Sequence, residues 1–233
     1  MKTARYNLKR YRRRLYEFFG SDHYSHPALN QIDRKLEKYM PYKNGFFIEA
    51  GASDGFAQSN TYYFERFLNW RGILVEPIPE LYEKCVKERP NSILFNCALV
   101  SADYDDQSVT MMYSNLMSLV KGAQKSDTAD LEHVRCGMKI QRSVEKIYEV
   151  VVPARTLTSI LDEVSVKEID FFSLDVEGYE LNVLKGLDLD RYRPKYMLIE
   201  ARFRDEIEDY LAEYYQVIDE LSKHDVIYIR KGR

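Results

Sequence analysis

The chain has 233 residues, of which 45% are apolar and 30% charged, and its formal net charge is −3. This length and composition suit one large globular domain and exclude a disordered or collagen-like chain. No apolar stretch approaches the roughly 20 residues of a membrane-spanning helix, and no apolar segment follows the basic N-terminus as it would in a secretory signal peptide. We therefore expect a cytoplasmic protein without a membrane span, with its three cysteines, Cys85, Cys97 and Cys136, reduced.

Positive charge is concentrated at the N-terminus. Residues 1–14 contain seven Lys or Arg and no acidic residue, which leaves a net charge of −10 on the rest of the chain. Apolar residues recur at helical spacing in residues 8–19 and again in residues 29–39. The sequence therefore predicts a basic helical extension over 1–42, followed by one domain over 43–233. Such an extension can bind a polyanion or anionic lipid, or pack against the acidic body of a neighbouring subunit in a homo-oligomer.

From residue 46 onward, short apolar runs alternate with helical patterns, which is typical of βαβ units around a parallel sheet. Buried parallel strands read as continuous apolar runs. The runs of this kind are Phe46–Ala50, Gly72–Glu76, Ser92–Leu99, Ile169–Asp175 and Lys195–Ala201. Helices are predicted over Thr61–Leu68, Glu80–Glu88, Leu157–Val164, Glu180–Leu184 and Arg204–Leu211.

Two further regions are less regular. Two weaker extended segments, Ser108–Tyr113 and Tyr148–Pro153, enclose a polar stretch, which we interpret as an inserted substrate loop or lid over residues 114–147. Near the C-terminus, residues 214–221 either pair with residues 225–230 as an antiparallel hairpin or continue the preceding helix. The local pattern fits both.

The residues that could bind a ligand or take part in a reaction follow the predicted strands, at the edge where open α/β sheets bind ligands. Glu49 lies near the end of the first strand, and a turn of small residues follows it, Gly51-Ala52-Ser53-Asp54-Gly55, through which the backbone can approach a ligand closely. The turn is not a GxGxxG motif, and Asp54 places a negative charge where a pyrophosphate would lie. This argues against NAD and against a P-loop, and favours a nucleoside site of another kind.

The next strand ends also carry side chains suited to a nucleoside. Glu76-Pro77 ends the second strand, where a carboxylate can accept two hydrogen bonds from a ribose diol or be an ordinary charged residue. Asn96 and Ala98 could meet the edge and the face of a base, or pack in the core. Ser59-Asn60 opens the first helix and either caps its free N–H groups or binds an anion such as an amino-acid carboxylate.

Acidic residues cluster after the fourth and fifth predicted strands. Asp175, Glu177 and Glu180 follow the fourth strand, and Glu200 lies at the end of the fifth. Carboxylates gathered at buried strand ends are costly unless a sulfonium, a divalent cation or a proton compensates them. The alternative is that Glu177 and Glu180 lie in the first turn of a helix and stabilise its dipole.

Several of these segments together resemble the FkbM-type S-adenosylmethionine (SAM)-dependent methyltransferases. The matching blocks are Phe47–Gly55, Ser59-Asn60-Thr61, Trp70–Pro77, Ser173–Glu180, Val183-Leu184-Lys185-Gly186 and Ile199-Glu200. They stand in the family's order and span about residues 46–231. The resemblance implies an α/β fold with a Rossmann-like, seven-stranded class I methyltransferase sheet, helices on both of its faces and an antiparallel C-terminal hairpin.

The resemblance also implies which residues bind SAM. In chain order they are Glu49, Gly51, Ala52, Ser53, Asp54, Gly55, Ser59, Asn60, Glu76, Pro77, Asn96, Ala98 and Asp175. The segment from Glu49 to Gly55 would line the methionine part of SAM, with Ser59 and Asn60 near its carboxylate. Glu76 would bind the ribose, and Asn96 and Ala98 would lie near the adenine. Asp175 and Glu177 would lie closest to the transferred methyl group.

Members of the family generally methylate oxygen, which implies an O-methyltransferase acting on a hydroxyl of a sugar, a glycan or a related small metabolite. A neutral hydroxyl needs a general base or a metal to become a good nucleophile. Asp175 or Glu177 is the expected base, acting directly or through Mg²⁺, with Glu200 in support and His133 as a weaker candidate. Where the family often has a His two residues after the last acid, this chain has Arg202.

Two other functions compete with this hypothesis. One is a catalytically silent methyltransferase-fold module that binds a polyanion or a protein partner through its basic extension. The other is an enzyme acting on nucleic acid, which is less favoured because the body is acidic and the extension interleaves few aromatic residues with its cations.

Overall fold

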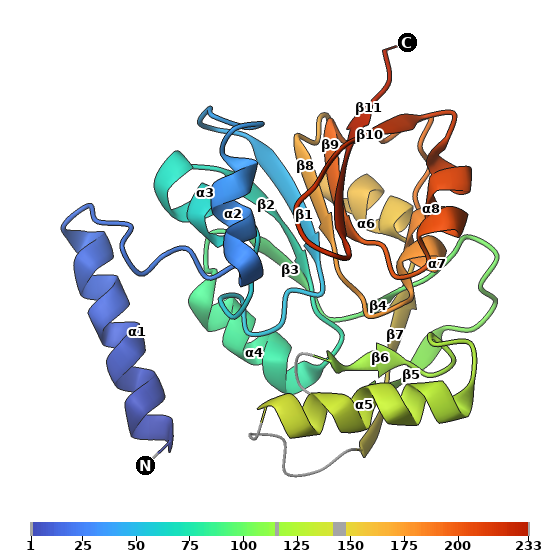
Figure 1. Cartoon of the computed structure of the whole chain (residues 1–233), viewed down its shortest axis with the longest axis horizontal. Helices are drawn as coiled ribbons and strands as arrows, with labels where there is room; N and C mark the ends of the chain where they lie inside the picture. The colour runs from blue at the N-terminus through green and yellow to red at the C-terminus, as the bar shows by residue number, and fades with distance from the viewer. Residues whose placement is uncertain (1, 115–116, 142–147, 233) are drawn as a thin grey trace.

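The computed structural model describes residues 2–114, 117–141 and 148–232 (Figure 1). Its centre is a seven-stranded sheet in the order β3-β2-β1-β8-β9-β11-β10. The strands are β1 (Phe46–Ala50), β2 (Arg71–Val75), β3 (Ile93–Phe95), β8 (Phe171–Leu174), β9 (Tyr196–Glu200), β10 (Tyr215–Glu220) and β11 (Asp225–Arg230). None of the described helices is long and apolar enough to cross a lipid bilayer.

Strand direction in this sheet follows the predicted βαβ pattern. β1, β2, β3, β8 and β9 are parallel, and β11 is antiparallel to both β9 and β10. The seven-stranded α/β fold with a C-terminal hairpin is therefore confirmed, and β10 does not continue the preceding helix. In the register Phe47 lies beside Gly72, and a side chain at Gly72 would collide with the Phe47 ring, since a Cβ there would be 2.4 Å from it.

Helices cover both faces of the sheet because successive strand side chains point to opposite sides. On one face α6 (Leu157–Val164), α7 (Glu180–Lys185) and α8 (Arg204–Leu211) pack in a core that includes Ile48. On the other face α2 (Ile32–Leu36), α3 (Tyr62–Leu68) and α4 (Pro79–Glu88) pack around Phe47. The expected three-layer arrangement is visible in Figure 1.

The predicted single strand Ser92–Leu99 is wrong. It divides into β3 and β4 (Ala98–Leu99), and β4 belongs to a second sheet in the order β4-β7-β5-β6. The chain leaves the large sheet at Asn96, whose side-chain amide donates hydrogen bonds to the carbonyls of Glu76 and Pro77 at 2.8 and 2.9 Å. An apolar run alone does not reveal this break, because both halves are apolar β structure, partly exposed in β3 and buried in β4.

The second sheet contains β5 (Ser108–Tyr113), β6 (Leu119–Val120) and β7 (Tyr148–Arg155), which include the two predicted extended segments. Helix α5 (Asp127–Gln141) lies against this sheet below the large one (Figure 1). The sequence interpretation of residues 114–147 as a loop or lid did not anticipate a helix there. Residues 115–116 and 142–147 of that stretch lie outside the described residues.

The N-terminal extension begins with α1 (Lys2–Phe18), the first of its two predicted helices. The second is shorter than predicted and consists of the 3₁₀ turn η1 (Leu29–Gln31) and α2. α1 lies at the edge of the molecule, beside α3 and α4 (Figure 1). All three cysteines are free; Cys85 and Cys97 are buried and Cys136 is exposed.

Candidate active site

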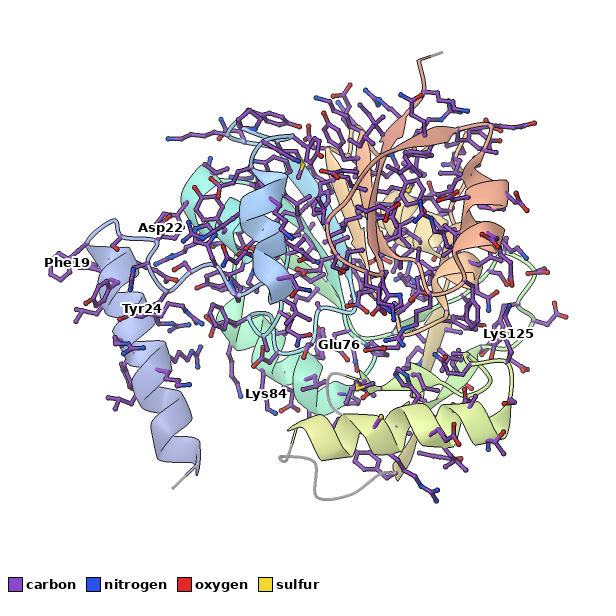
Figure 2. All side chains as sticks on the ribbon, in the orientation of Figure 1. Phe19, Asp22, Tyr24, Glu76, Lys84 and Lys125 are labelled. Carbon is purple, nitrogen blue, oxygen red and sulfur yellow. The ribbon has the colours of Figure 1, made fainter. Side chains whose placement is uncertain are left out.

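A cleft of about 880 Å³ opens at the carboxyl ends of the parallel strands, between the large sheet and the second sheet. Figure 2 labels Glu76, which lies above α5 in that view. The predicted site residues that line the cleft are Glu49, Gly51, Ser53, Asn60, Glu76, Pro77, Ala98, Asp175 and Glu177. Those outside its lining are Ala52, Asp54, Gly55, Ser59, Asn96 and Glu200.

Glu49, in β1, is held by the segment that opens the first crossover helix. Its Oε2 accepts hydrogen bonds from the hydroxyls of Ser59 at 2.9 Å and Thr61 at 2.5 Å, and its Oε1 accepts one from the Asn60 N–H at 2.9 Å. The buried Arg89 guanidinium lies 3.6 Å away. Ser59 and Thr61 therefore fix the Glu49 carboxylate, while Asn60 reaches both Glu49 and the cleft.

Arg89 is a supporting residue that the sequence analysis missed. It is fully buried, forms a 2.6 Å ion pair with Glu65 and donates to Ser59 Oγ and to the Gly55 carbonyl. An arginine followed by proline just after a helix is a signal of chain reversal, but no local pattern indicates that its side chain turns inward to a strand end.

The turn after β1 has the backbone geometry that its small residues suggest. Gly51 has φ +88°, and a Cβ there would lie 1.9 Å from the carbonyl oxygen of Asp175. Only glycine allows this approach, which brings the turn against the chain that follows β8. Asp54 closes the turn, since its carboxylate accepts N–H bonds from Phe56 at 3.0 Å and Ala57 at 2.7 Å.

Glu76 follows β2 and is 5% exposed. Its two oxygens accept backbone N–H bonds from Ser53 at 2.7 Å and from Ile78 at 2.8 Å. Burial, with a smaller contribution from the negative charge of Asp54, raises the pKa of Glu76 to about 7. The carboxylate is thus fixed in place, yet each oxygen keeps a further lone pair for a hydrogen-bond donor in the cleft.

Three carboxylates form an acidic rim, which we define as Asp175, Glu177 and Glu200. Each offers an oxygen within 4.8 Å of the others. Asp175 is exposed, yet the surrounding protein displaces much of the bulk water around its carboxyl group. This desolvation, together with repulsion by Glu200 and Glu177, raises the pKa of Asp175 well above its usual range. Glu177 has a left-handed backbone, with φ +57°, a conformation in which a non-glycine residue is strained.

Two basic side chains meet this rim. Arg202 donates to Glu177 Oε2 at 2.7 Å and to Glu200 Oε2 at 3.0 Å. His133, from α5, lies 3.0 Å from the same Glu177 oxygen. The residue that replaces the family's frequent histidine is therefore a guanidinium that joins two of the acids, and a histidine reaches the rim from a helix distant in sequence.

Glu180 lies behind the rim and is fully buried. Its Oε1 accepts N–H bonds from Val176 at 3.1 Å and Gly178 at 2.9 Å, whereas its Oε2 has no hydrogen-bond partner among the described residues. Burial raises the pKa of Glu180 to about 7. Its contacts hold the turn that carries Glu177.

Comparison with known families covers the part of the chain that carries this cleft. The Methyltransferase FkbM domain matches residues 49–227, which is more than half of the chain. The chain belongs to the FkbM methyltransferase family. Its sheet is accordingly the Rossmann-like class I methyltransferase sheet that the sequence resemblance implied.

Solved structures resemble the chain only distantly. A methyltransferase from Geobacter sulfurreducens has 10% identity and a TM-score of 0.45, with 94% of this chain and 85% of that chain covered. A TehB-like SAM-dependent methyltransferase from Corynebacterium glutamicum has 12% identity and a TM-score of 0.40, with 98% and 100% covered. Fibrillarin from Aeropyrum pernix, solved with natively bound S-adenosyl-L-methionine, has 13% identity and a TM-score of 0.39, with 81% and 66% covered. A search of curated proteins finds no match.

Proposed function

We propose that this FkbM-family protein is a SAM-dependent O-methyltransferase whose acceptor is a hydroxyl of a sugar, a glycan or a related small metabolite. The observation that carries the proposal is that Glu49, Glu76 and Asp175, from three neighbouring strand ends, all line one cleft. A cleft with a few fixed polar groups at the carboxyl ends of parallel strands is typical of small-molecule sites in α/β proteins.

The cleft residues fit SAM. Glu76 is fixed by two backbone N–H groups and keeps acceptor capacity for the two hydroxyls of a ribose. Gly51 lets the turn after β1 pack against the Asp175 carbonyl, an approach that any side chain would block. Glu49, Glu76 and Asp175 make the cleft electronegative, which suits a ligand with a positively charged sulfur. When bound, SAM supplies an electrophilic methyl group; the chain's own residues have to orient the acceptor and remove its proton.

Asp175 is the proposed general base. A carboxylate with a raised pKa takes a hydroxyl proton more readily than an ordinary aspartate does, and both desolvation by the surrounding protein and the neighbouring Glu200 and Glu177 raise the pKa of Asp175. Glu177 and Glu200, joined by Arg202, are proposed to hold the rim in position. His133 supports Glu177 rather than replacing Asp175, because it contacts Glu177.

Mg²⁺ is not needed to account for the rim. The oxygens of Asp175, Glu177 and Glu200 are of the type that Mg²⁺ prefers. However, Arg202 already pairs with Glu177 and Glu200, so a cation would have to displace its guanidinium. The proposed mechanism therefore has no step through a metal.

The walls of the cleft favour a neutral acceptor. Met111, Val120 and Tyr179 line the same cleft as the acids. A lining that combines apolar side chains with carboxylates suits the apolar face of a sugar ring and its hydroxyls, and disfavours an anionic acceptor such as a nucleic acid. The silent-module alternative loses support because all three cleft acids are present. A cytoplasmic location and a homo-oligomer stay predictions.

The test begins with calorimetry of the purified chain with SAM, with S-adenosylhomocysteine and with NAD as a control. We expect micromolar binding of the first two and none of NAD. Transfer of a labelled methyl group to a panel of sugars, glycans and hydroxylated metabolites is then measured with and without a chelator. Absence of cofactor binding would reject the proposal, as would methylation of amine acceptors alone. Activity lost with the chelator and restored by Mg²⁺ would reject the metal-free mechanism.

A further inference from the structure

The outward face of α1 is apolar. Leu8, Tyr11, Leu15 and Phe18 are 69%, 74%, 56% and 80% exposed, and Phe19, just after the helix, is 76% exposed. Their spacing of three or four residues places them on one side of the helix. We call these five residues the α1 stripe. Figure 2 shows the labelled Phe19 pointing away from the rest of the molecule.

The inward face of α1 is charged, which is the reverse of an ordinary surface helix. Arg13 and Glu17 are buried, at 5% and 8% exposure. Arg13 pairs with Glu88 of α4, and Glu17 accepts hydrogen bonds from the hydroxyls of Ser25 and Tyr62. Because rotation of the helix would leave these buried charges without partners, the stripe is fixed on the outside.

The charges beside the stripe are all positive. Glu17 is the only acidic residue of α1, and it is buried on the inward face. Lys9, Arg12 and Arg14 are exposed. At 100° per residue, Lys9 and Arg12 lie on one side of the stripe and Arg14 on the other. An aromatic and aliphatic stripe with cations on both of its sides is typical of helices that lie in the interface of an anionic membrane.

A second copy of the chain fits this face less well. Residues 2–18 contain seven basic residues and one acidic residue, so two α1 helices packed stripe to stripe would bring like charges together. An anionic bilayer offers an apolar layer to the stripe and negatively charged lipid headgroups to the cations beside it.

We propose that α1 binds peripherally to anionic lipid membranes, with the α1 stripe inserted into the interface and Lys9, Arg12 and Arg14 at the phosphates. The proposal goes beyond methyl transfer and does not depend on it, because it rests only on residues of α1 and on their contacts with α3 and α4.

The test is flotation of the full chain with vesicles of phosphatidylcholine alone or with phosphatidylglycerol added. We expect binding to the anionic vesicles and at least about 10-fold less to the neutral ones, and less at high salt. The double variant Leu15→Ser, Phe18→Ser should reduce binding to anionic vesicles about 10-fold or more. The matched control is Leu29→Ser, which alters a side chain of similar exposure, 57%, outside α1, and should bind as the wild type does.

Other results would overturn the proposal. One is failure of the wild type to float with anionic vesicles, and another is equal binding by the double variant. A third is sedimentation that shows a dimer for the wild type and a monomer for the double variant, which would assign the stripe to a second copy. Since the substituted side chains are exposed, thermal unfolding should be unchanged in every variant, and that measurement excludes misfolding as the cause of lost binding.

Discussion

The carboxylates of the cleft differ in what their surroundings do to them. Glu76 is held by two N–H groups in a buried position, whereas Asp175 lies among other acids. The first environment suits a binding residue, because fixed acceptors recognise a ligand's donors. The second suits proton transfer, because desolvation and repulsion by the neighbouring acids both raise the proton affinity of Asp175.

The role of Glu76 predicts a pH dependence of cofactor binding. Its pKa is raised to about 7, and hydrogen bonds from a ribose favour the ionised form, so SAM affinity should fall as the pH falls below about 7. Between pH 8 and pH 6 we expect a loss of up to about 10-fold, measured by calorimetry. The variant Glu76→Gln should bind about 1 to 3 kcal/mol more weakly and lose this pH dependence. Because the amino group of SAM also titrates, any pH dependence that remains in this variant is due to the ligand. An unchanged affinity in Glu76→Gln would show that Glu76 does not bind the cofactor.

The role of Asp175 predicts a separation of binding from turnover. In Asp175→Asn the shape is kept and the proton acceptor is lost, so methyl transfer at saturating SAM should slow about 100-fold or more. Calorimetry should find SAM affinity within about 3-fold of the wild type, since asparagine keeps the shape of the cleft and Glu49 and Glu76 keep their carboxylates. Glu200→Gln, which alters the rim beside it, should slow turnover less. Near-normal turnover of Asp175→Asn would place the base elsewhere.

At the scale of elements, the position of α1 depends on buried charges rather than on an apolar face. Arg13 pairs with Glu88, and its guanidinium lies 3.5 Å from the centre of the Phe56 ring. Glu88 also pairs with Arg10 at 2.7 Å. Arg14 lies 3.7 Å from the same carboxylate, so the contact combines a carboxylate shared by three arginines with a cation–π contact at Arg13.

Removal of Arg13 should loosen α1 without unfolding the domain. We expect amide hydrogens of α1 in Arg13→Ala to exchange about 10-fold faster or more, which corresponds to about 1 to 3 kcal/mol. Protection in β1 and β8 should be unchanged. The control is Arg12→Ala, whose exposed side chain lies over the Tyr24 ring and should matter little. If both variants behaved alike, the Arg13–Glu88 contact would not anchor the helix.

For the whole molecule, the buried acids make stability depend on pH. Glu76 and Glu180 both have pKa values raised to about 7. The native state therefore binds more protons than the unfolded chain between the usual carboxyl pKa and about 7. Their stabilising protonation is complete at low pH and is lost as the pH rises through this window.

Without cofactor, the thermal midpoint should accordingly be several degrees higher at pH 6 than at pH 8, with each acid contributing about 1 to 3 kcal/mol. Glu180→Gln keeps an oxygen that can accept from Val176 and Gly178 and removes the buried charge, so it should be more stable than the wild type at pH 8 and flatten the pH curve. A wild-type midpoint that does not change between these pH values would contradict the assignment.

The positions of most strands of the large sheet and the acidic residues at their ends could be predicted from the sequence, because buried parallel strands are apolar runs and polar residues that follow them stand out. Local pattern could not reveal that the third run breaks at Asn96, since its two halves are both apolar strands and differ only in the sheet to which they belong. Nor could it place Arg89 beside Glu49 or His133 beside Glu177, because these contacts join residues far apart in the chain.

The amphipathic pattern of α1 was visible in the sequence, but only the tertiary structure decided that its apolar side faces outward. The physical reason is that buried ion pairs with Glu88 and hydrogen bonds to Glu17 fix the other side against the domain.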